Sequence, residues 1–148
     1  MRVLVQRVAR AAVHVNGETV ASIGPGLLLF VAFKTGDGDS DLAWMAEKIA
    51  NLRIFEDGAG KMNRSLLEVG GQALAVSQFT LYGDARKGRR PSFDASAPAD
   101  QARPLFEKFV DFLSSRGIMT GVGRFQAVMR VELVNDGPVT IMLDSPGG

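Results

Sequence analysis

The apolar run LLLFVAF at 27–33 constrains the fold more than any other part of the sequence. Gly24-Pro25-Gly26 precedes the run and Lys34 follows it, so it is short and sharply bounded. An apolar run of this length without alternation is typical of a central strand buried on both faces. It is too short to cross a bilayer, which takes about 20 apolar residues. The sequence therefore predicts a sheet with a fully buried strand at its centre.

The segments around this strand have patterns typical of further strands. In residues 2–8, apolar and polar side chains alternate, and Asn16-Gly17 separates two short runs as a strong hairpin signal. Asn135-Asp136-Gly137-Pro138 has the composition of a tight turn between the last two strands. The strands that we expect beside 27–33 are 2–8, 11–15, 18–23, 73–82, 124–134 and 139–144.

Two segments have the apolar spacing of helices. Leu42, Met45, Ala46, Ile49 and Leu52 recur at helical intervals after the acidic turn 36–41. A second helix is expected over about 99–115, with Pro104 in its first turn or at a kink. Strands and two main helices without regular βαβ alternation predict a single α+β domain over 1–148. We expect layered, largely antiparallel or mixed and barrel-like β-sheets, with both helices packed on one side.

Composition removes several kinds of chemistry. The chain has no cysteine and one histidine, His14, so it has no thiolate nucleophile and no cluster of imidazole metal ligands. A Ser-His-Asp triad would depend on His14, which alternation places on a solvated strand face. We therefore expect no metal and no cofactor. Without a secretion signal or a membrane span the protein is expected in the cytoplasm, and the net charge of +1 predicts no bulk attraction to nucleic acid.

A basic loop is the first candidate for ligand binding. The loop concentrates four cations within five positions, next to Phe93, whose ring suits stacking on an unpaired base. A solvated loop that keeps the protein soluble accounts for the same charges equally well. The cations that we expect to attract phosphate groups are Arg86, Lys87, Arg89 and Arg90.

The polar residues Ser77, Gln78 and Thr80 lie beside Phe79 at the end of a buried strand and lead into that loop. Hydroxyl and amide groups there can position a polar substrate, although Ser77 and Thr80 also simply suit a β-strand. Nothing nearby in the sequence supplies the general base that a Thr80 nucleophile requires.

Taken together, these segments resemble the D-aminoacyl-tRNA deacylase family over nearly the whole chain. The pair SQFT (77–80) and GPVT (137–140) is the most specific signal. One departure is Val128, where members often have an acidic residue, so local hydrogen bonding must differ there. The other matching segments are VQRV (5–8), LRIFED (52–57), GKMN (60–63), SQFTLY (77–82), KGRRPSF (87–93), GRF (123–125) and NDGPVT (135–140).

The resemblance implies a homodimer that hydrolyses the ester of D-aminoacyl-tRNA and rejects the L form. In the family, the Gly137-Pro138 bond is cis and enters the partner subunit's pocket beside the SQFT strand, braced by an arginine that Arg7 matches. The partner molecules are thus a second copy and the 3′ acceptor end of aminoacyl-tRNA. The site residues that we carry over are Ser77, Gln78, Phe79, Thr80, Phe93, Met129, Gly137, Pro138, Val139, Thr140 and Arg7.

Selection by exclusion cannot exclude a hydrogen atom, so glycyl-tRNA, including glycine mischarged on tRNA(Ala), is an expected second substrate. The family is thought to use RNA-assisted catalysis, in which the 2′-hydroxyl of the terminal adenosine acts as the base. Main-chain N–H groups around Phe79 and Thr80 would stabilise the oxyanion. Two other interpretations stay open: an RNA-binding dimer without catalysis, and a structural dimer whose GPVT turn closes an interface.

Overall fold

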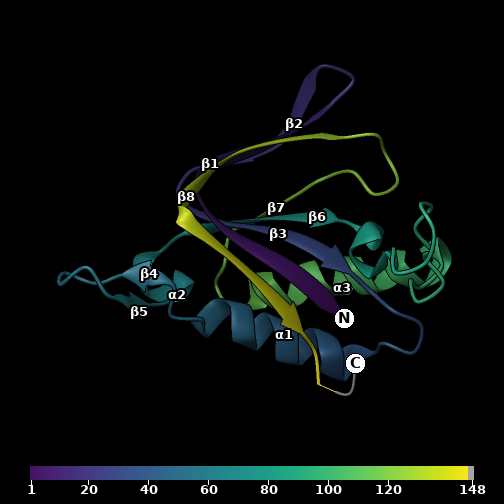
Figure 1. The fold of residues 1–148 in the computed structure, drawn as a ribbon. Helices are drawn as coiled ribbons and strands as arrows, with labels where there is room; N and C mark the ends of the chain where they lie inside the picture. The colour runs from purple at the N-terminus through teal and green to yellow at the C-terminus, as the bar shows by residue number, and fades with distance from the viewer. Residues whose placement is uncertain (147–148) are drawn as a thin grey trace.

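The computed structural model describes residues 1–146 and contains one large mixed sheet, a small second sheet and a layer of helices (Figure 1). The strands of the large sheet are β1 (Arg2–Val15), β2 (Glu18–Ile23), β3 (Gly26–Ala32), β6 (Gln72–Ser77), β7 (Thr120–Val122) and β8 (Arg130–Asp144). The small sheet pairs β4 (Phe55–Glu56) with β5 (Met62–Arg64). The helices are α1 (Asp39–Asn51), α2 (Leu66–Val69), the 3₁₀ helix η1 (Phe79–Tyr82) and α3 (Ala99–Ser115).

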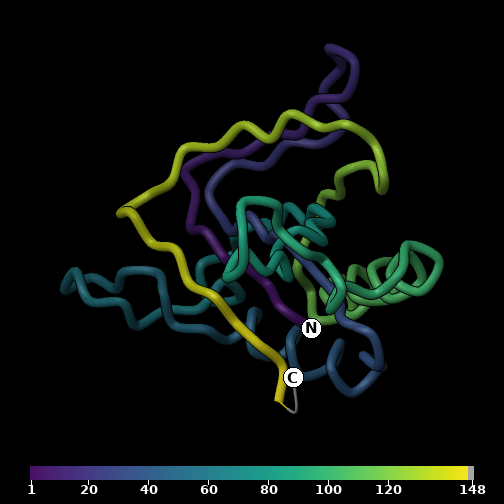
Figure 2. The backbone as a smooth tube through the Cα atoms, turned by 45° about the vertical axis from the view of Figure 1, so that its right-hand side comes forward, coloured from purple at the N-terminus to yellow at the C-terminus, as the bar shows by residue number. Residues whose placement is uncertain are grey.

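The large sheet curls because β1 is long enough to serve two sets of partners. Its first half pairs with β3 and its second half with β2, while β8 pairs antiparallel along nearly all of its other edge. The parallel strands β6 and β7 extend the sheet beyond β3. Figure 2 shows the backbone wrapping around the interior, which confirms the expected mixed, barrel-like α+β fold.

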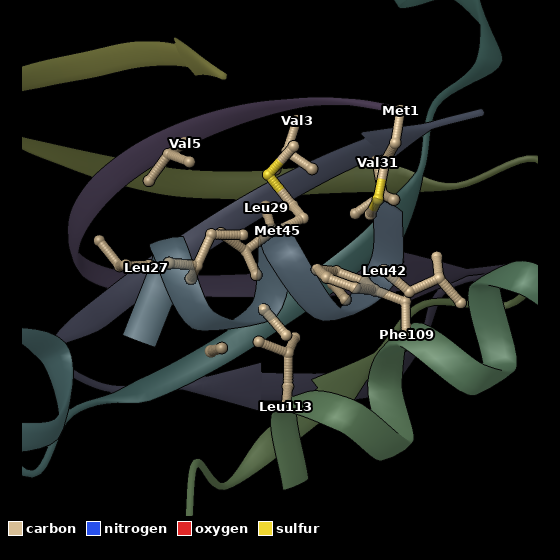
Figure 3. Close-up of a cluster of buried hydrophobic side chains, with 14 of the residues drawn as sticks. Met1, Val3, Val5, Leu27, Leu29, Val31, Leu42, Met45, Phe109 and Leu113 are labelled. Carbon is tan, nitrogen blue, oxygen red and sulfur yellow. The ribbon is translucent and has the colours of Figure 1, made fainter. Parts of the chain in front are cut away.

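Strand β3 is buried on both faces, as its apolar run predicts. Leu27 and Leu29 are fully buried in a cluster with α1 and α3, which both lie on this side of the sheet (Figure 3). Leu28 is fully buried in a second cluster on the opposite face, with residues of β1, β2 and β6. Strand β3 therefore contributes side chains to two hydrophobic cores, a larger one on the helix side of the sheet and a smaller one on the opposite face.

The expected helices form, with three corrections. Leu42, Met45, Ala46 and Ile49 are buried on α1 as predicted, but Leu52 lies just after the helix and is half-buried. Helix α3 begins at Ala99, and Pro104 lies in its second turn. There Pro104 is exposed, so water can reach the carbonyl that its missing N–H leaves free. The short helix α2 was not expected, although Ser65 and Glu68 form a capping box and Gly70 ends the helix with φ 64°.

The strand boundaries need further corrections. The Asn16-Gly17 hairpin is confirmed, with φ of 51° and 79°, but 2–8 and 11–15 form one continuous strand. The run 73–82 is a strand only to Ser77, after which the chain turns into η1. Residues 124–129 are not a strand, because Ala127 N–H bonds Arg124 O (3.2 Å) and closes a turn. The predicted turn at 135–138 is wrong as well, since β8 continues through it.

Candidate active site

A cavity of about 680 Å³ opens where β6 ends. Its walls come from η1, the start of α3, the segment before α3 and the turn before β8. The cavity is largely apolar, with a polar edge formed by the end of β6. The lining residues are Val76, Ser77, Gln78, Phe79, Phe93, Ser96, Ala97, Ala99, Ala102, Phe125, Gln126, Ala127, Met129 and Val131.

Five of the predicted site residues are therefore gathered at one cavity, namely Ser77, Gln78, Phe79, Phe93 and Met129. Phe125, which precedes the turn, was not singled out, although it belongs to the quoted GRF segment. Ser96 and Ala102 carried no signal in the sequence, because their positions depend on how α3 packs. The structure thus brings these five residues together, and their roles as site residues stay predictions.

The turn at 77–80 leaves two main-chain donors free. Gln78 N–H is bonded to Val31 O (2.7 Å). Because η1 begins at Phe79, the N–H groups of Phe79 and Thr80 have no acceptor among residues 1–146. Two adjacent free N–H groups beside a cavity are the arrangement that an oxyanion hole requires.

The Thr80 side chain is poorly placed for nucleophilic attack. It is not among the cavity-lining residues, and its hydroxyl oxygen accepts a hydrogen bond from the Gln78 side-chain amide. The chain's one histidine, His14, is bonded instead to Glu132 and Thr19 on the β1–β2–β8 surface. Within residues 1–146, neither a histidine nor a carboxylate is hydrogen-bonded to the Thr80 hydroxyl.

The η1 turn is braced by the segment that follows the basic loop. The Ser96 hydroxyl donates to Phe79 O (3.0 Å), and the rings of Phe79 and Phe93 meet edge to face with centroids 5.2 Å apart. Gly83 is required at the end of η1, because a Cβ there would lie 2.9 Å from Thr80 O. The Ser96 contact holds the Phe79–Thr80 peptide through its carbonyl, on the side opposite the Thr80 N–H.

The Gly137-Pro138 segment forms a bulge in β8. Gln6 pairs with Thr140 and Val8 with Asn135, so the four residues 136–139 lie opposite the single residue Arg7. The Gly137-Pro138 peptide bond is cis, as the resemblance implies.

Hydrogen bonds to Arg7 of β1 and across its own base hold the bulge in place. Arg7, with its side chain only 7% exposed, donates through Nε to Asp136 O (3.2 Å) and forms an ion pair with the Asp136 carboxylate (3.4 Å). The Asn135 amide donates to Arg7 O (2.9 Å) and to Val139 O (3.1 Å), which closes the base of the loop. Arg7 therefore braces the bulge as expected.

The bulge and the cavity of the same chain lie far apart. Arg7 pairs with Leu27, which pairs with Ala73, whereas the cavity lining on β6 begins at Val76, three residues further along and about 10 Å away. Strand β8 reaches the cavity at Val131, but the bulge begins five residues further along it, at Asp136. Gly137 and Pro138 do not line this chain's own cavity, and Figure 1 shows the bend of β8 on the opposite side of the molecule from the end of β6.

The basic loop is only partly neutralised. Arg86 makes two hydrogen bonds to the Asp84 carboxylate (2.9 and 2.7 Å), which lower the pKa of Asp84 to about 2. The side chains of Lys87, Arg89 and Arg90 are exposed and form no ion pair with any residue in 1–146. Main-chain bonds between Asp84 and Ser92 (2.7 and 2.8 Å) close the loop, so it presents three free cations near the cavity.

Two other observations bear on the expectations. Val128 is 91% exposed on the turn before β8, where it makes no packing contact that would replace an acidic side chain. None of the helices in the described part of the chain is long and apolar enough to cross a membrane.

Comparisons with known proteins bear directly on this site. The family described as D-Tyr-tRNA(Tyr) deacylase matches residues 4–144. The chain belongs to this family. A D-aminoacyl-tRNA deacylase of Heliobacterium modesticaldum is 57% identical over 148 residues, covering 100% of this chain and 99% of that protein. One from Thermomicrobium roseum is 60% identical over 145 residues, covering 98% and 94%.

Two solved structures share the deacylase fold. One, described as a c-Myc DNA unwinding element binding protein, has a TM-score of 0.94 and 40% identity and covers 99% of this chain and 100% of its own. A probable eukaryotic D-amino acid tRNA deacylase has a TM-score of 0.83 over 96% and 97% of the two chains; at 20% identity it supports the fold alone. At the level of the family, the prediction of a D-aminoacyl-tRNA deacylase, a hydrolase of the ester bond, is confirmed.

Proposed function

We propose that this chain acts as a homodimer in which each subunit inserts Gly137-Pro138 into its partner's cavity and hydrolyses the ester of D-aminoacyl-tRNA there. The observation that carries the proposal is the separation of the braced bulge from the cavity of its own chain. A main-chain loop held by Arg7 and Asn135 at the outer edge of a sheet can meet such a cavity only on another molecule.

Chiral selection follows from what the bulge would present. Main-chain atoms have no rotamers, so a bulge fixed at its base by Asn135 is a stiff obstacle. It would stand next to one substituent of the α-carbon of the aminoacyl group on the substrate. An L side chain would collide with it, whereas a D side chain would point away. Glycine has only hydrogen at both positions and passes the same test, so glycyl-tRNA, including glycyl-tRNA(Ala), is a second substrate.

The chemistry requires little from the side chains. An aminoacyl ester is already activated, and the N–H groups of Phe79 and Thr80, which have no acceptor within residues 1–146, would stabilise an oxyanion. The 2′-hydroxyl of the terminal adenosine supplies the base, because the cavity holds no histidine or carboxylate among its lining residues. The three free cations of the 84–92 loop bind phosphates of the acceptor end without reading bases.

Single-turnover deacylation of D-tyrosyl-tRNA tests this proposal. We expect wild type and Thr80→Ala to release D-tyrosine, L-tyrosyl-tRNA to remain intact, and a substrate with a terminal 2′-deoxyadenosine to be stable. A gel shift without release of amino acid would instead support a binding dimer without catalysis. Sedimentation would measure the oligomeric state, and a monomer that still discriminates D from L would contradict the exchange of bulges.

A further inference from the structure

The β4–β5 hairpin has no role in the site as described. It comprises residues 53–64 and includes the segments RIFED and GKMN. Figures 1 and 2 show it projecting from the body at the end of the molecule where β8 bends, away from the end of β6. An exposed hairpin of this length requires an explanation beyond the packing of the core.

Arg7 connects the hairpin to the bulge. Its Nη1 donates to Ile54 O (2.8 Å) at the base of the hairpin, while its Nε donates to Asp136 O in the bulge. Phe55 and Asp136 line the same small cavity of about 230 Å³ around Arg7. A single buried guanidinium thus fixes the two segments relative to each other, so the hairpin accompanies the bulge wherever it docks.

The tip of the hairpin is ordered by its own hydrogen bonds. The Asp57 carboxylate accepts from Ala59 N (2.8 Å), Lys61 N (3.0 Å) and the Asn63 amide (3.2 Å). Asp57 N–H also donates to Lys61 O (2.8 Å), and Gly60 takes the left-handed φ of 77° that this turn requires. Since Asp57 is occupied within the turn, its charge is directed inward rather than toward a ligand.

The tip presents one free cation outward. The Lys61 side chain is exposed, and its ammonium makes no hydrogen bond or ion pair with residues 1–146. Arg53 and Arg64 lie at the base of the hairpin, each bonded to a main-chain carbonyl oxygen, of Asn63 and Glu68 respectively, while the exposed Glu56 carboxylate is paired with Arg7 (4.0 Å). A fixed tip with an unneutralised lysine, on a hairpin with two more cations at its base, complements a phosphate backbone.

We propose that Lys61 contacts a phosphate of the RNA whose aminoacyl end lies in the partner subunit's cavity. This inference rests on the proposed function, because the bulge must first enter that cavity. The chain's own cavity is excluded by the separation along β6, so the contact is made across the dimer. Each active site would then combine the 84–92 loop of one subunit with the hairpin of the other.

The first test compares two exposed lysines. We expect Lys61→Ala to raise the KM for D-tyrosyl-tRNA about fivefold with kcat unchanged, and to reduce the slope of log KM against log salt by about 0.7. The matched control is Lys48→Ala, whose ammonium lies over Trp44 on α1 (5.4 Å), outside the proposed RNA path. If the two variants have the same KM and salt slope, the inference is wrong. It is equally overturned if Lys61→Ala acts only by weakening the dimer in sedimentation.

The second test asks which subunit the hairpin serves. A heterodimer pairs a Lys61→Ala chain with a Phe79→Pro chain, whose cavity lacks the Phe79 N–H. Its one competent cavity belongs to the Lys61→Ala chain and faces a wild-type hairpin, so we expect a wild-type KM. A raised KM would show that the hairpin serves its own chain, which contradicts the inference.

A third heterodimer separates the two proposals. This heterodimer pairs a Gly137→Ala chain with the same Phe79→Pro chain. The substitution distorts the bulge, because Gly137 has φ 122° and a Cβ there would lie 2.9 Å from Arg7 Nη2. If this heterodimer hydrolyses D-tyrosyl-tRNA and leaves L-tyrosyl-tRNA intact, a raised KM in the previous heterodimer would overturn only the hairpin contact. Hydrolysis of L-tyrosyl-tRNA by this heterodimer would overturn the exchange of bulges on which both proposals depend.

Discussion

Replacing Phe79 by proline removes one main-chain donor from the proposed oxyanion hole together with the phenyl ring. Phe79 is the first residue of η1, and its N–H has no acceptor within residues 1–146. Proline is favoured at the first position of a helix, because its fixed φ of about −65° fits and the missing N–H is unpaired there anyway. Gln78, with ψ 75°, is already outside the α region that a following proline disfavours.

The matched control is Phe79→Ala. Both variants lose the ring, which is 54% exposed and touches Phe93, so any effect of lost stacking cancels between them. Only Phe79→Pro also loses the N–H. The hydroxyl of Ser96 still bonds the carbonyl of residue 79 in both variants, which keeps the position of the turn comparable.

Removal of one oxyanion donor costs about 10²–10³ in kcat, or about 2.7–4 kcal/mol. We therefore expect Phe79→Pro to deacylate D-tyrosyl-tRNA at least about a hundredfold more slowly than Phe79→Ala under single-turnover conditions, because only the Thr80 N–H remains. Thermal unfolding should give similar midpoints for the two proteins. Equal rates from two equally stable variants would refute the assignment of this N–H to the oxyanion.

Three further predictions concern the bulge, the basic loop and the core. Asn135→Ala leaves the carbonyls of Arg7 and Val139 without their donor, so we expect a loss of about 1–2 kcal/mol in unfolding free energy and measurable hydrolysis of L-tyrosyl-tRNA. Arg86→Ala should return the pKa of Asp84 from about 2 toward 3.8 in a carboxyl carbon NMR titration. Because that pKa is lowered in the folded protein, the contact stabilises the loop above about pH 4 and is lost as pH falls toward 2; an unchanged Asp84 titration would contradict this. Phe109→Ala, at a fully buried position of α3, should lower the unfolding free energy by about 3–5 kcal/mol in urea titrations.

The parts of the fold that sequence patterns predicted are those decided locally. The apolar run at 27–33, the stripe of α1 and the Asn16-Gly17 hairpin each depend on residues within one element. Their periodicity or turn chemistry is visible in a short window, and tertiary contacts reinforce it.

The errors occur where distant strands decide the outcome. Residues 135–138 have the composition of a turn, but pairing with β1 on both sides converts the segment into a bulge in a continuous strand. The end of β6 at Ser77 coincides with its last pairing partner, Val31, which the β-forming residues after it could not reveal. Gln126 adopts a φ of 62° in a turn where glycine is usual, so the sequence carries no signal for it.

In the candidate site, too, sequence predicted the features that depend on neighbouring residues and missed those that depend on distant segments. Ser77, Gln78 and Phe79 are adjacent in sequence, so they lie together at the cavity for local reasons. The positions of Ser96 and Phe125 depend on how α3 and the turn before β8 pack, and sequence alone did not identify them as part of the site. The link from Arg7 to Ile54 is likewise a long-range contact that no motif announces.

The separation of bulge and cavity has a consequence for how selectivity depends on assembly. A lone subunit would keep the cavity and the free N–H groups of Phe79 and Thr80, but it would lack the obstacle that rejects L side chains. Hydrogen bonds from Arg7 and Asn135 hold that obstacle in place on each chain, so it is ready before two subunits meet. Under the proposed exchange of bulges, we expect discrimination between D and L substrates to fall as dilution lowers the dimer fraction. Residual hydrolysis by monomers, where present, would not be stereoselective.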